Sequence, residues 1–109
     1  MEFEYEMDGE TLFVRLPREV DHHNCRDFKV QTQVILEEQY IRRMVFDFRN
    51  TEFMDSSGIG VLLLRYKQMR GGGGQIGYFG ASGRMKRILE MAGILHQLTE
   101  YEGKKEARG

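Results

Sequence analysis

A short, almost wholly apolar segment near the middle of the chain, residues 44–48 with the sequence MVFDF, constrains the fold most. A strand of this composition is typical of the centre of a parallel sheet, where both faces are covered. Helix-like patterns flank it on both sides in the sequence, and such alternation requires right-handed crossover connections between parallel strands. The sequence therefore predicts an α/β fold with a mixed, mostly parallel β-sheet.

Three further strands and a possible last one complete the predicted sheet. Residues 3–8 alternate apolar and acidic side chains, which is the period of a half-buried strand. Asp8-Gly9 suits a tight hairpin turn, so the run 11–17 is expected to return antiparallel and end at Pro17. The later strands are expected at residues 75–79 and within residues 94–101, and residues 50–55 are expected to be a loop.

Three helices are expected: one that follows the capping residues 21–24 and runs to about Gln39, one that begins at Ser56 or Ser57, and one that ends at Gly93. Each has apolar side chains at steps of three and four residues, which gives one inward face. These stripes are Cys25, Phe28, Thr32 and Ile35; Ile59, Leu62, Leu63 and Tyr66; and Met85, Ile88, Leu89 and Ala92. The solvent side of the second helix is expected to carry Arg65, Lys67, Gln68 and Arg70.

The length of 109 residues suits one hydrophobic core, so residues 1–101 are expected to form a single small domain and residues 102–109 a disordered tail. The 16 Lys and Arg residues nearly balance 17 Asp and Glu residues, which does not favour direct contact with nucleic acid. The single cysteine, Cys25, fits a reducing compartment. With no signal peptide and no apolar run long enough for a bilayer, we expect a cytoplasmic protein without membrane contact.

The segment 51–60, with the sequence TEFMDSSGIG, links the apolar strand to the second helix. It is expected at the carboxyl edge of the parallel strands, where open α/β sheets place binding sites. A helix needs one capping residue, but three candidates are present: Asp55, Ser56 and Ser57. Gly58 and Gly60 each cost on the order of 1 kcal/mol relative to Ala in a helix and would let another backbone approach. A plain helix cap and a docking site are both open interpretations.

Other sites are less favoured by the sequence. His22 and His23 are adjacent and cannot chelate a metal from one helix face, so neither a metal nor a cofactor is expected. Asp21 and these histidines could cap the first helix, contact a partner, or simply face solvent. The spacing Gly-x-Ser-x-Gly of a nucleophile elbow is absent around Ser56, so no catalytic residue is assigned and an enzyme is not expected.

Two separated motifs resemble those of one known family. The run FMDSSGIGVL at residues 53–62, with RYKQ at residues 65–68, looks like the anti-sigma factor antagonists, whose STAS domain also occurs in sulfate transporters. Asp21-His22-His23 is similar to the Asp-His-His that this group has before its first helix. The likeness covers residues 3–100, is greatest to the group that acts in sporulation, and implies helices packed largely on one side of the sheet.

The resemblance implies a phosphoprotein that regulates transcription by partner switching. It would bind an anti-sigma factor that is also a serine kinase, and so free a sigma factor. The kinase, which supplies the ATP, would phosphorylate Ser56, and a serine phosphatase would restore it. The residues expected to contact the partner are Asp21, His22, His23, Asp55, Ser56, Ser57, Gly58, Ile59 and Gly60.

Pro17-Arg18 departs from the Thr-Gly-like turn usual in this group and adds bulk and charge close to the expected docking surface. Two other functions stay open: a STAS scaffold or sensor subunit of a larger signalling assembly, and a small serine hydrolase that uses Ser56 covalently. A monomer is expected, because strand faces and helix stripes account for the apolar residues.

Overall fold

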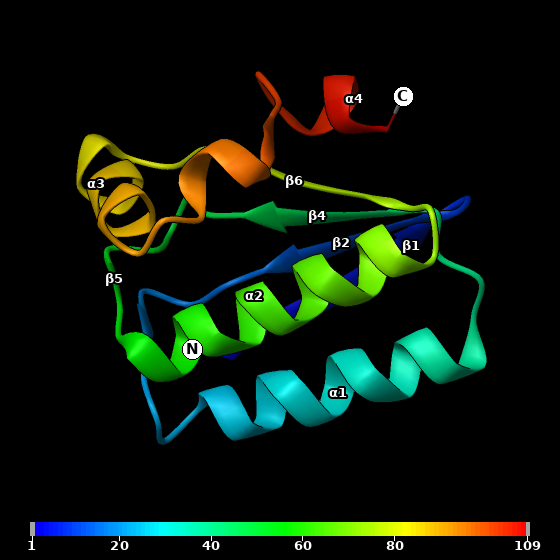
Figure 1. The fold of residues 1–109 in the computed structure, drawn as a ribbon, viewed down its shortest axis with the longest axis horizontal. Helices are drawn as coiled ribbons and strands as arrows, with labels where there is room; N and C mark the ends of the chain where they lie inside the picture. Colours follow the sequence, from blue (N-terminus) through cyan, green and yellow to red (C-terminus); the bar gives the residue numbers. More distant parts are fainter. Residues whose placement is uncertain (1, 109) are drawn as a thin grey trace.

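The computed structural model describes residues 2–108, and five of its strands form a mixed sheet in the order β1-β2-β4-β6-β7 (Figure 1). The strands are β1 Glu4–Asp8, β2 Thr11–Arg15, β4 Arg43–Asp47, β6 Gln75–Phe79 and β7 Thr99–Glu100. β1 is antiparallel to β2 through a hairpin at Gly9, whose φ of 62° is the conformation that glycine tolerates best. All other neighbours in this sheet are parallel. The predicted mixed, mostly parallel sheet is confirmed.

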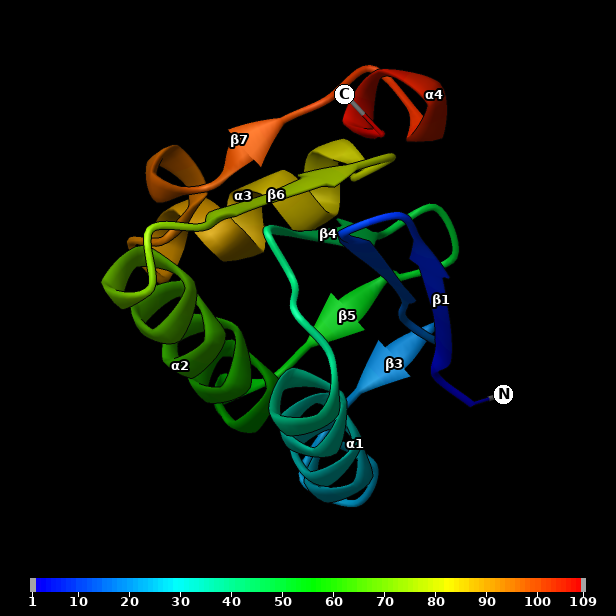
Figure 2. The ribbon, with the colours of Figure 1, turned by 90° about the vertical axis from the view of Figure 1, so that its right-hand side faces the viewer.

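Three helices cover one face of this sheet, α1 Cys25–Glu38, α2 Ser56–Gly71 and α3 Gly83–Met91 (Figures 1 and 2). Their apolar side chains share one cluster with alternate residues of the central strands, among them Phe28, Leu62, Met85, Leu12, Met44 and Ile76. The opposite face has a smaller cluster of Phe13, Val45, Phe79 and Ala107. The arrangement implied by the family resemblance, with helices largely on one side, is therefore confirmed.

A second, two-stranded parallel sheet pairs β3 Glu19–Val20 with β5 Phe53–Met54. The expectation that residues 50–55 form only a loop is therefore wrong. Val20 and Met54 are buried in the main apolar cluster, and pairing satisfies backbone groups that would otherwise be buried without partners. The β3–β5 pair is too short to produce an alternating pattern that sequence reasoning could detect.

The buried side of α2 also differs from the predicted stripe. Arg65 is completely buried, whereas Leu63, which was expected inside, is 37% exposed. The buried set is Gly58, Val61, Leu62, Arg65 and Met69. The helix is rotated because it packs against α1 as well as the sheet, and α1 offers hydrogen-bond acceptors to the Arg65 guanidinium.

Residues 94–101 contain the predicted turn and strand, here a 3-10 helix η1 (Leu95–Gln97) followed by β7. Residues 102–108 differ from the predicted disordered tail, because they include a short helix α4 (Lys104–Ala107) packed on β6. Ala107 is buried on the second face of the sheet. Arg108 Nε lies 2.7 Å from Asp8 Oδ2, and Arg43 Nη1 donates to the Ala107 carbonyl over 2.6 Å. These polar contacts and the burial of Ala107 fix residues 102–108 against the sheet, although the segment has no apolar stripe.

Candidate protein-binding site

The β3–β5 pair brings the two sequence motifs together, although they lie far apart along the chain (Figure 2). Val20 and Met54 are register partners, so Asp21 and Asp55 leave neighbouring strands at the same end. The Asp55 N–H donates to the Val20 carbonyl over 3.0 Å, which fixes this juxtaposition. The starts of α1 and α2 therefore form one continuous surface, which is the candidate site.

Asp55 is the cap of α2. Its Oδ1 accepts hydrogen bonds from the backbone N–H of Ser57 over 2.9 Å and of Gly58 over 3.2 Å. Because one residue satisfies the cap, Ser56 and Ser57 are not needed for it. Ser56 is exposed as the first residue of the helix, where backbone N–H groups and the helix dipole favour negative charge.

Asp21 supports the turn before α1. Its Oδ1 accepts from the backbone N–H of His23 over 2.9 Å and of Asn24 over 3.1 Å, and Asn24 Oδ1 accepts from the Asp21 N–H over 3.0 Å. The capping interpretation holds for Asp21 in this sense, although Asn24 is the residue at the helix N-cap. His22 and His23 are exposed with ring centroids 4.0 Å apart, and their contact with a partner stays a prediction.

The two glycines of the motif have different surroundings. A Cβ on Gly58 would lie 2.6 Å from Met54 Cγ and 2.8 Å from Val20 Cγ1, so the β3–β5 pair requires glycine there. A Cβ on Gly60 would meet nothing within 4 Å, and this residue is exposed. Gly58 therefore allows α2 to pack closely against the β3–β5 pair of the same chain, whereas Gly60 leaves open space at the protein surface. Ile59, between them, is half-buried against the main core.

We expect Asp55→Ala to lower the free energy of unfolding by about 1 kcal/mol, since the N–H groups of Ser57 and Gly58 lose their acceptor. Urea denaturation followed by circular dichroism measures this. Ser56→Ala is the control, because its side chain is not the cap and an exposed substitution changes stability by less than about 0.5 kcal/mol. Equal losses for both variants would contradict the assignment of the cap to Asp55.

Arg18, which departs from the family pattern, lies beside this surface. Its Nε is 3.2 Å from Glu52 Oε1, and its carbonyl accepts from the Glu52 N–H over 2.8 Å. Both side chains are largely exposed. The added positive charge is therefore paired with a carboxylate within the chain instead of standing alone at the docking surface.

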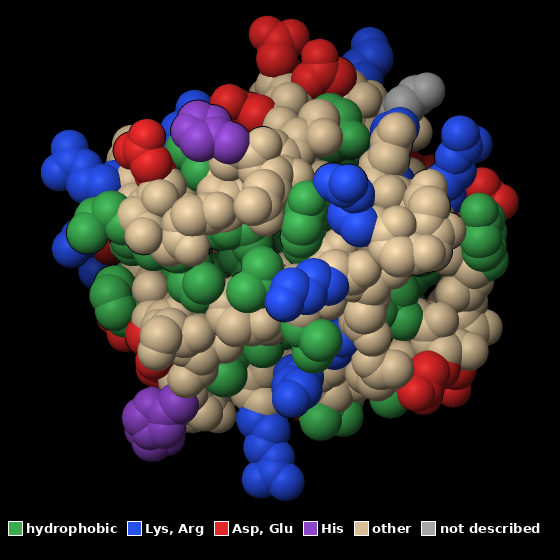
Figure 3. Space-filling view, in the orientation of Figure 1, with side chains coloured by type: hydrophobic (Ala, Val, Ile, Leu, Met, Phe, Trp, Pro, Cys, Tyr) green, Lys and Arg blue, Asp and Glu red, His purple; other side chains and the backbone are tan. Residues whose placement is uncertain are grey.

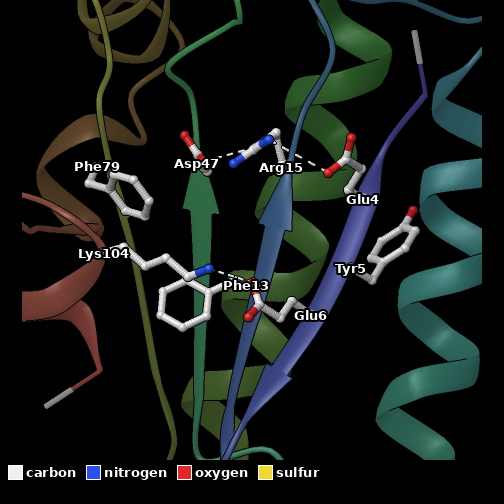
Figure 4. A pocket seen from close by; sticks show the side chains of 8 residues that line it. All are labelled: Glu4, Tyr5, Glu6, Phe13, Arg15, Asp47, Phe79 and Lys104. Atoms are coloured by element: carbon white, nitrogen blue, oxygen red, sulfur yellow. Dashed lines mark hydrogen bonds and ion pairs between the residues drawn. The ribbon is translucent and has the colours of Figure 1, made fainter.

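A pocket on the opposite face of the sheet contains no predicted site residue (Figure 4). One of its lining residues is Asp47, whose carboxylate accepts from Arg49 Nη2 over 2.8 Å and from Arg15 Nε over 3.2 Å. Burial alone would raise the pKa of Asp47, but these hydrogen bonds hold it below its ordinary value. Lys104 reaches over the Phe13 ring from α4. The only sequence feature that pointed to this pocket was the position of Asp47 between two inward phenylalanines. The carboxylate of Asp47 is already paired with the two arginines.

Across residues 2–108, no three His, Cys, Asp or Glu side chains are grouped so that they could hold a metal ion. None of the helices in that range has the length and apolar character needed to cross a bilayer.

The comparisons with known proteins agree with the geometry. The model of the STAS domain matches residues 2–107. The anti-sigma F factor antagonist of Paenibacillus polymyxa is 31% identical over 107 residues, which cover 98% of this chain and 92% of that protein. The structure of the unphosphorylated anti-sigma factor antagonist SpoIIAA has a TM-score of 0.85 at 24% identity, covering 96% of this chain and 91% of the other.

The phosphorylated form of the Bacillus cell fate determinant SpoIIAA has a TM-score of 0.77 at 25% identity, covering 96% and 95% of the two chains. The same fold is thus present in relatives solved with and without phosphate. The resemblance inferred from the two sequence motifs is confirmed, and this chain belongs to the STAS-domain family of anti-sigma factor antagonists.

Proposed function

We propose that this chain binds an anti-sigma factor with serine kinase activity, frees a sigma factor in doing so, and is released when Ser56 is phosphorylated. The observation that carries this proposal is the exposed Ser56 at the first turn of α2, beside the turn at Asp21, in a chain whose relative is an anti-sigma F factor antagonist. The chain acts by binding, as a cytoplasmic monomer in sporulation, without a cofactor or contact with nucleic acid. A serine phosphatase resets it.

The position of Ser56 suits a reversible modification. Phosphoserine adds roughly −1.5 to −2 charges at neutral pH. A helix N-terminus receives an anion well, so the fold tolerates the phosphate even though Asp55 lies next to it. SpoIIAA has been solved in both forms, and each superposes on this chain, which supports a switch without refolding.

The phosphate blocks the partner by its size and charge. A partner that packs against Ser56 and the open surface at Gly60 would have to desolvate a dianion. An unpaired buried charge costs several kcal/mol, and about 1.4 kcal/mol corresponds to a tenfold loss of affinity. Contact between the partner and the phosphate on Ser56 is therefore enough to abolish binding, without a change elsewhere in the fold.

Two substitutions test this account by titration calorimetry with the anti-sigma F factor of Paenibacillus polymyxa, the target named for the relative. Ser56→Ala is expected to bind within about threefold of the wild type, and Ser56→Asp about tenfold or more weakly. Ser82→Asp is the matched control, because Ser82 caps α3 and Asp caps equally well while adding the same charge.

Circular dichroism should be the same for all three variants. If Ser82→Asp weakened binding as much as Ser56→Asp, net charge and not the Ser56 surface would control the affinity. If Ser56→Asp bound as tightly as the wild type, Ser56 would not lie in the contact.

A further inference from the structure

The seam between α1 and α2 is hollowed along much of its length. One hollow of about 420 Å³ extends from Ser57 to Leu64, and another of about 390 Å³ continues to Val34. Arg26 and Lys29 line both hollows. Together they form one surface feature, here called the α1–α2 groove, which begins one residue from Ser56.

The groove is basic, and in the described part of the chain its cations form no ion pair. Across residues 2–108, no carboxylate oxygen lies within 4.0 Å of the charged groups of Arg26, Lys29 or Arg65. Arg26 and Lys29 are exposed, whereas Arg65 is buried and donates to uncharged oxygens of Thr32 and of the Lys29 backbone. Within the described residues, therefore, no ion pair engages the positive charge along the seam.

Aliphatic side chains accompany these cations. Val30 and Val34 on α1 are 48% and 38% exposed, and both line the second hollow. Leu64 on α2 is half-buried in the first. In the space-filling view, hydrophobic and basic side chains intermingle over α1 and α2, while acidic side chains gather toward the margins (Figure 3). Such a surface complements a segment that is both apolar and acidic.

We propose that the α1–α2 groove is a second docking surface, which binds an acidic amphipathic segment of the partner protein. Aliphatic side chains of that segment would pack on Val30, Val34 and Leu64, and its carboxylates would pair with Arg26 and Lys29. Charge complementarity of this kind steers association and fixes register. The groove continues from the surface at Ser56, so one partner can occupy both. This second surface rests on the proposed function, because the partner that supplies the acidic segment is the anti-sigma factor.

A phosphate on Ser56 has a further effect under this arrangement. Ser57 lines the end of the groove, so a dianion on the neighbouring residue has the same sign as the acidic segment that binds there. It also competes for the positive potential of Arg26 and Lys29. The modification therefore weakens the groove contact as well as the contact at the helix start.

The test is charge reversal of the pair, Arg26→Glu with Lys29→Glu, measured by calorimetry against the anti-sigma F factor of Paenibacillus polymyxa. We expect about tenfold weaker binding or more, with a smaller dependence of affinity on salt than the wild type. Arg84→Glu with Arg87→Glu is the matched control, with the same spacing and charge change on exposed residues of α3. It should bind within about twofold to threefold of the wild type. Equal melting temperatures of the two double variants exclude unfolding as the cause.

The outcomes separate the two proposals. If the wild type binds and the Arg26/Lys29 variant binds equally well, the groove is overturned while the proposed function stands. The same is true if the α3 control weakens binding as much. If the wild type does not bind this anti-sigma factor, the proposed function fails, and the groove is tested with a synthetic peptide of alternating Glu and Leu faces by amide chemical shifts.

Peptide binding in the groove is supported if the amide shifts are confined to residues 26–34 and 57–68 and are lost in the Arg26/Lys29 variant. Amide shifts elsewhere would overturn the proposed groove. Vesicles of anionic lipid are a third probe. Sedimentation with them that depends on Arg26 and Lys29, without peptide binding, would assign the groove to a membrane surface and overturn the protein partner.

Discussion

Replacing Arg65 by Ala is expected to lower the free energy of unfolding by about 3 kcal/mol, because large buried side chains cost about 2–5 kcal/mol when truncated. Arg65 is completely buried between α1 and α2. Its Nε donates to Thr32 Oγ1 over 2.8 Å and its Nη2 to the Lys29 carbonyl over 2.6 Å. Nη1 contacts Gln33 and Gln68. Truncation leaves a cavity and removes the guanidinium that ties these acceptors together across the seam, so that of the bonds named here only the one from Gln68 Nε2 to Gln33 Oε1 crosses it.

Arg65→Met separates volume from charge. No carboxylate is left unpaired when the guanidinium is removed, and Thr32 Oγ1 keeps its own bond to the Phe28 carbonyl over 2.8 Å. Burial lowers the pKa of Arg65, because desolvation opposes the charged form of the guanidinium. A well-packed apolar replacement of a buried charge is often tolerated, so Met should cost about 1 kcal/mol or less. Urea denaturation measures both variants, and a loss for Met as large as for Ala would show that hydrogen bonds outweigh packing.

Gly58→Ala is expected to destabilise the fold by about 2 kcal/mol, within the range found when methyl groups are added to packed interiors. The new Cβ would lie 2.6 Å from Met54 Cγ and 2.8 Å from Val20 Cγ1, so either these side chains or α2 must move. Movement of α2 would also shift Ser56 relative to Asp21. We therefore expect weaker partner binding together with the loss of stability.

Gly60→Ala is the matched control for Gly58→Ala. Gly60 lies in the same helix, but a Cβ there meets nothing within 4 Å. Since Ala is the better helix former by about 1 kcal/mol, this substitution should stabilise the fold slightly. Thermal unfolding of both variants would show changes of opposite sign. A stabilised Gly58→Ala variant would mean that the contact with Met54 and Val20 is not tight in solution.

The main sheet could be predicted because its longer strands carry recognisable patterns of apolar and polar residues. The apolar run at residues 44–48 required a covered central strand, and the alternating run before Asp8-Gly9 required an antiparallel edge. The helix stripes gave the correct number and order of the longer helices. Each of these signals extends over at least one full period of a strand or helix.

The parts that the sequence did not reveal depend on tertiary context. The β3–β5 pair has two residues in each strand, which is shorter than any detectable alternation. Arg65 was expected in solvent because charge predicts exposure, but three acceptor groups on the facing helix α1 and one on α2 itself reverse this preference. α4 is held by ion pairs with β1, by the bond from Arg43 to the Ala107 carbonyl and by the burial of Ala107, so composition offered no signal for it.

The sequence predicted that residues 21–23 and the start of the second helix lie on one surface, but it did not predict the strand pair that joins them. The motifs at residues 21–23 and 55–60 were both identified, and capping was among the interpretations of each. Their joining depends on the β3–β5 pair, which only the structure shows. Whether Asp55, Ser56 or Ser57 formed the cap was also undecidable from types alone, since all three residues accept hydrogen bonds.

The central claim is that one phosphate on Ser56 abolishes partner binding while the fold stays intact. The most direct measurement incubates the protein with the anti-sigma factor kinase and ATP, locates the phosphate by mass spectrometry, and determines the affinity of the purified phosphoprotein by calorimetry. The account predicts phosphate on Ser56, binding weaker by about a hundredfold or more, and amide shifts confined to residues 54–62. Phosphate on Ser57 only, unchanged affinity, or shifts spread through the sheet and α3 would contradict it.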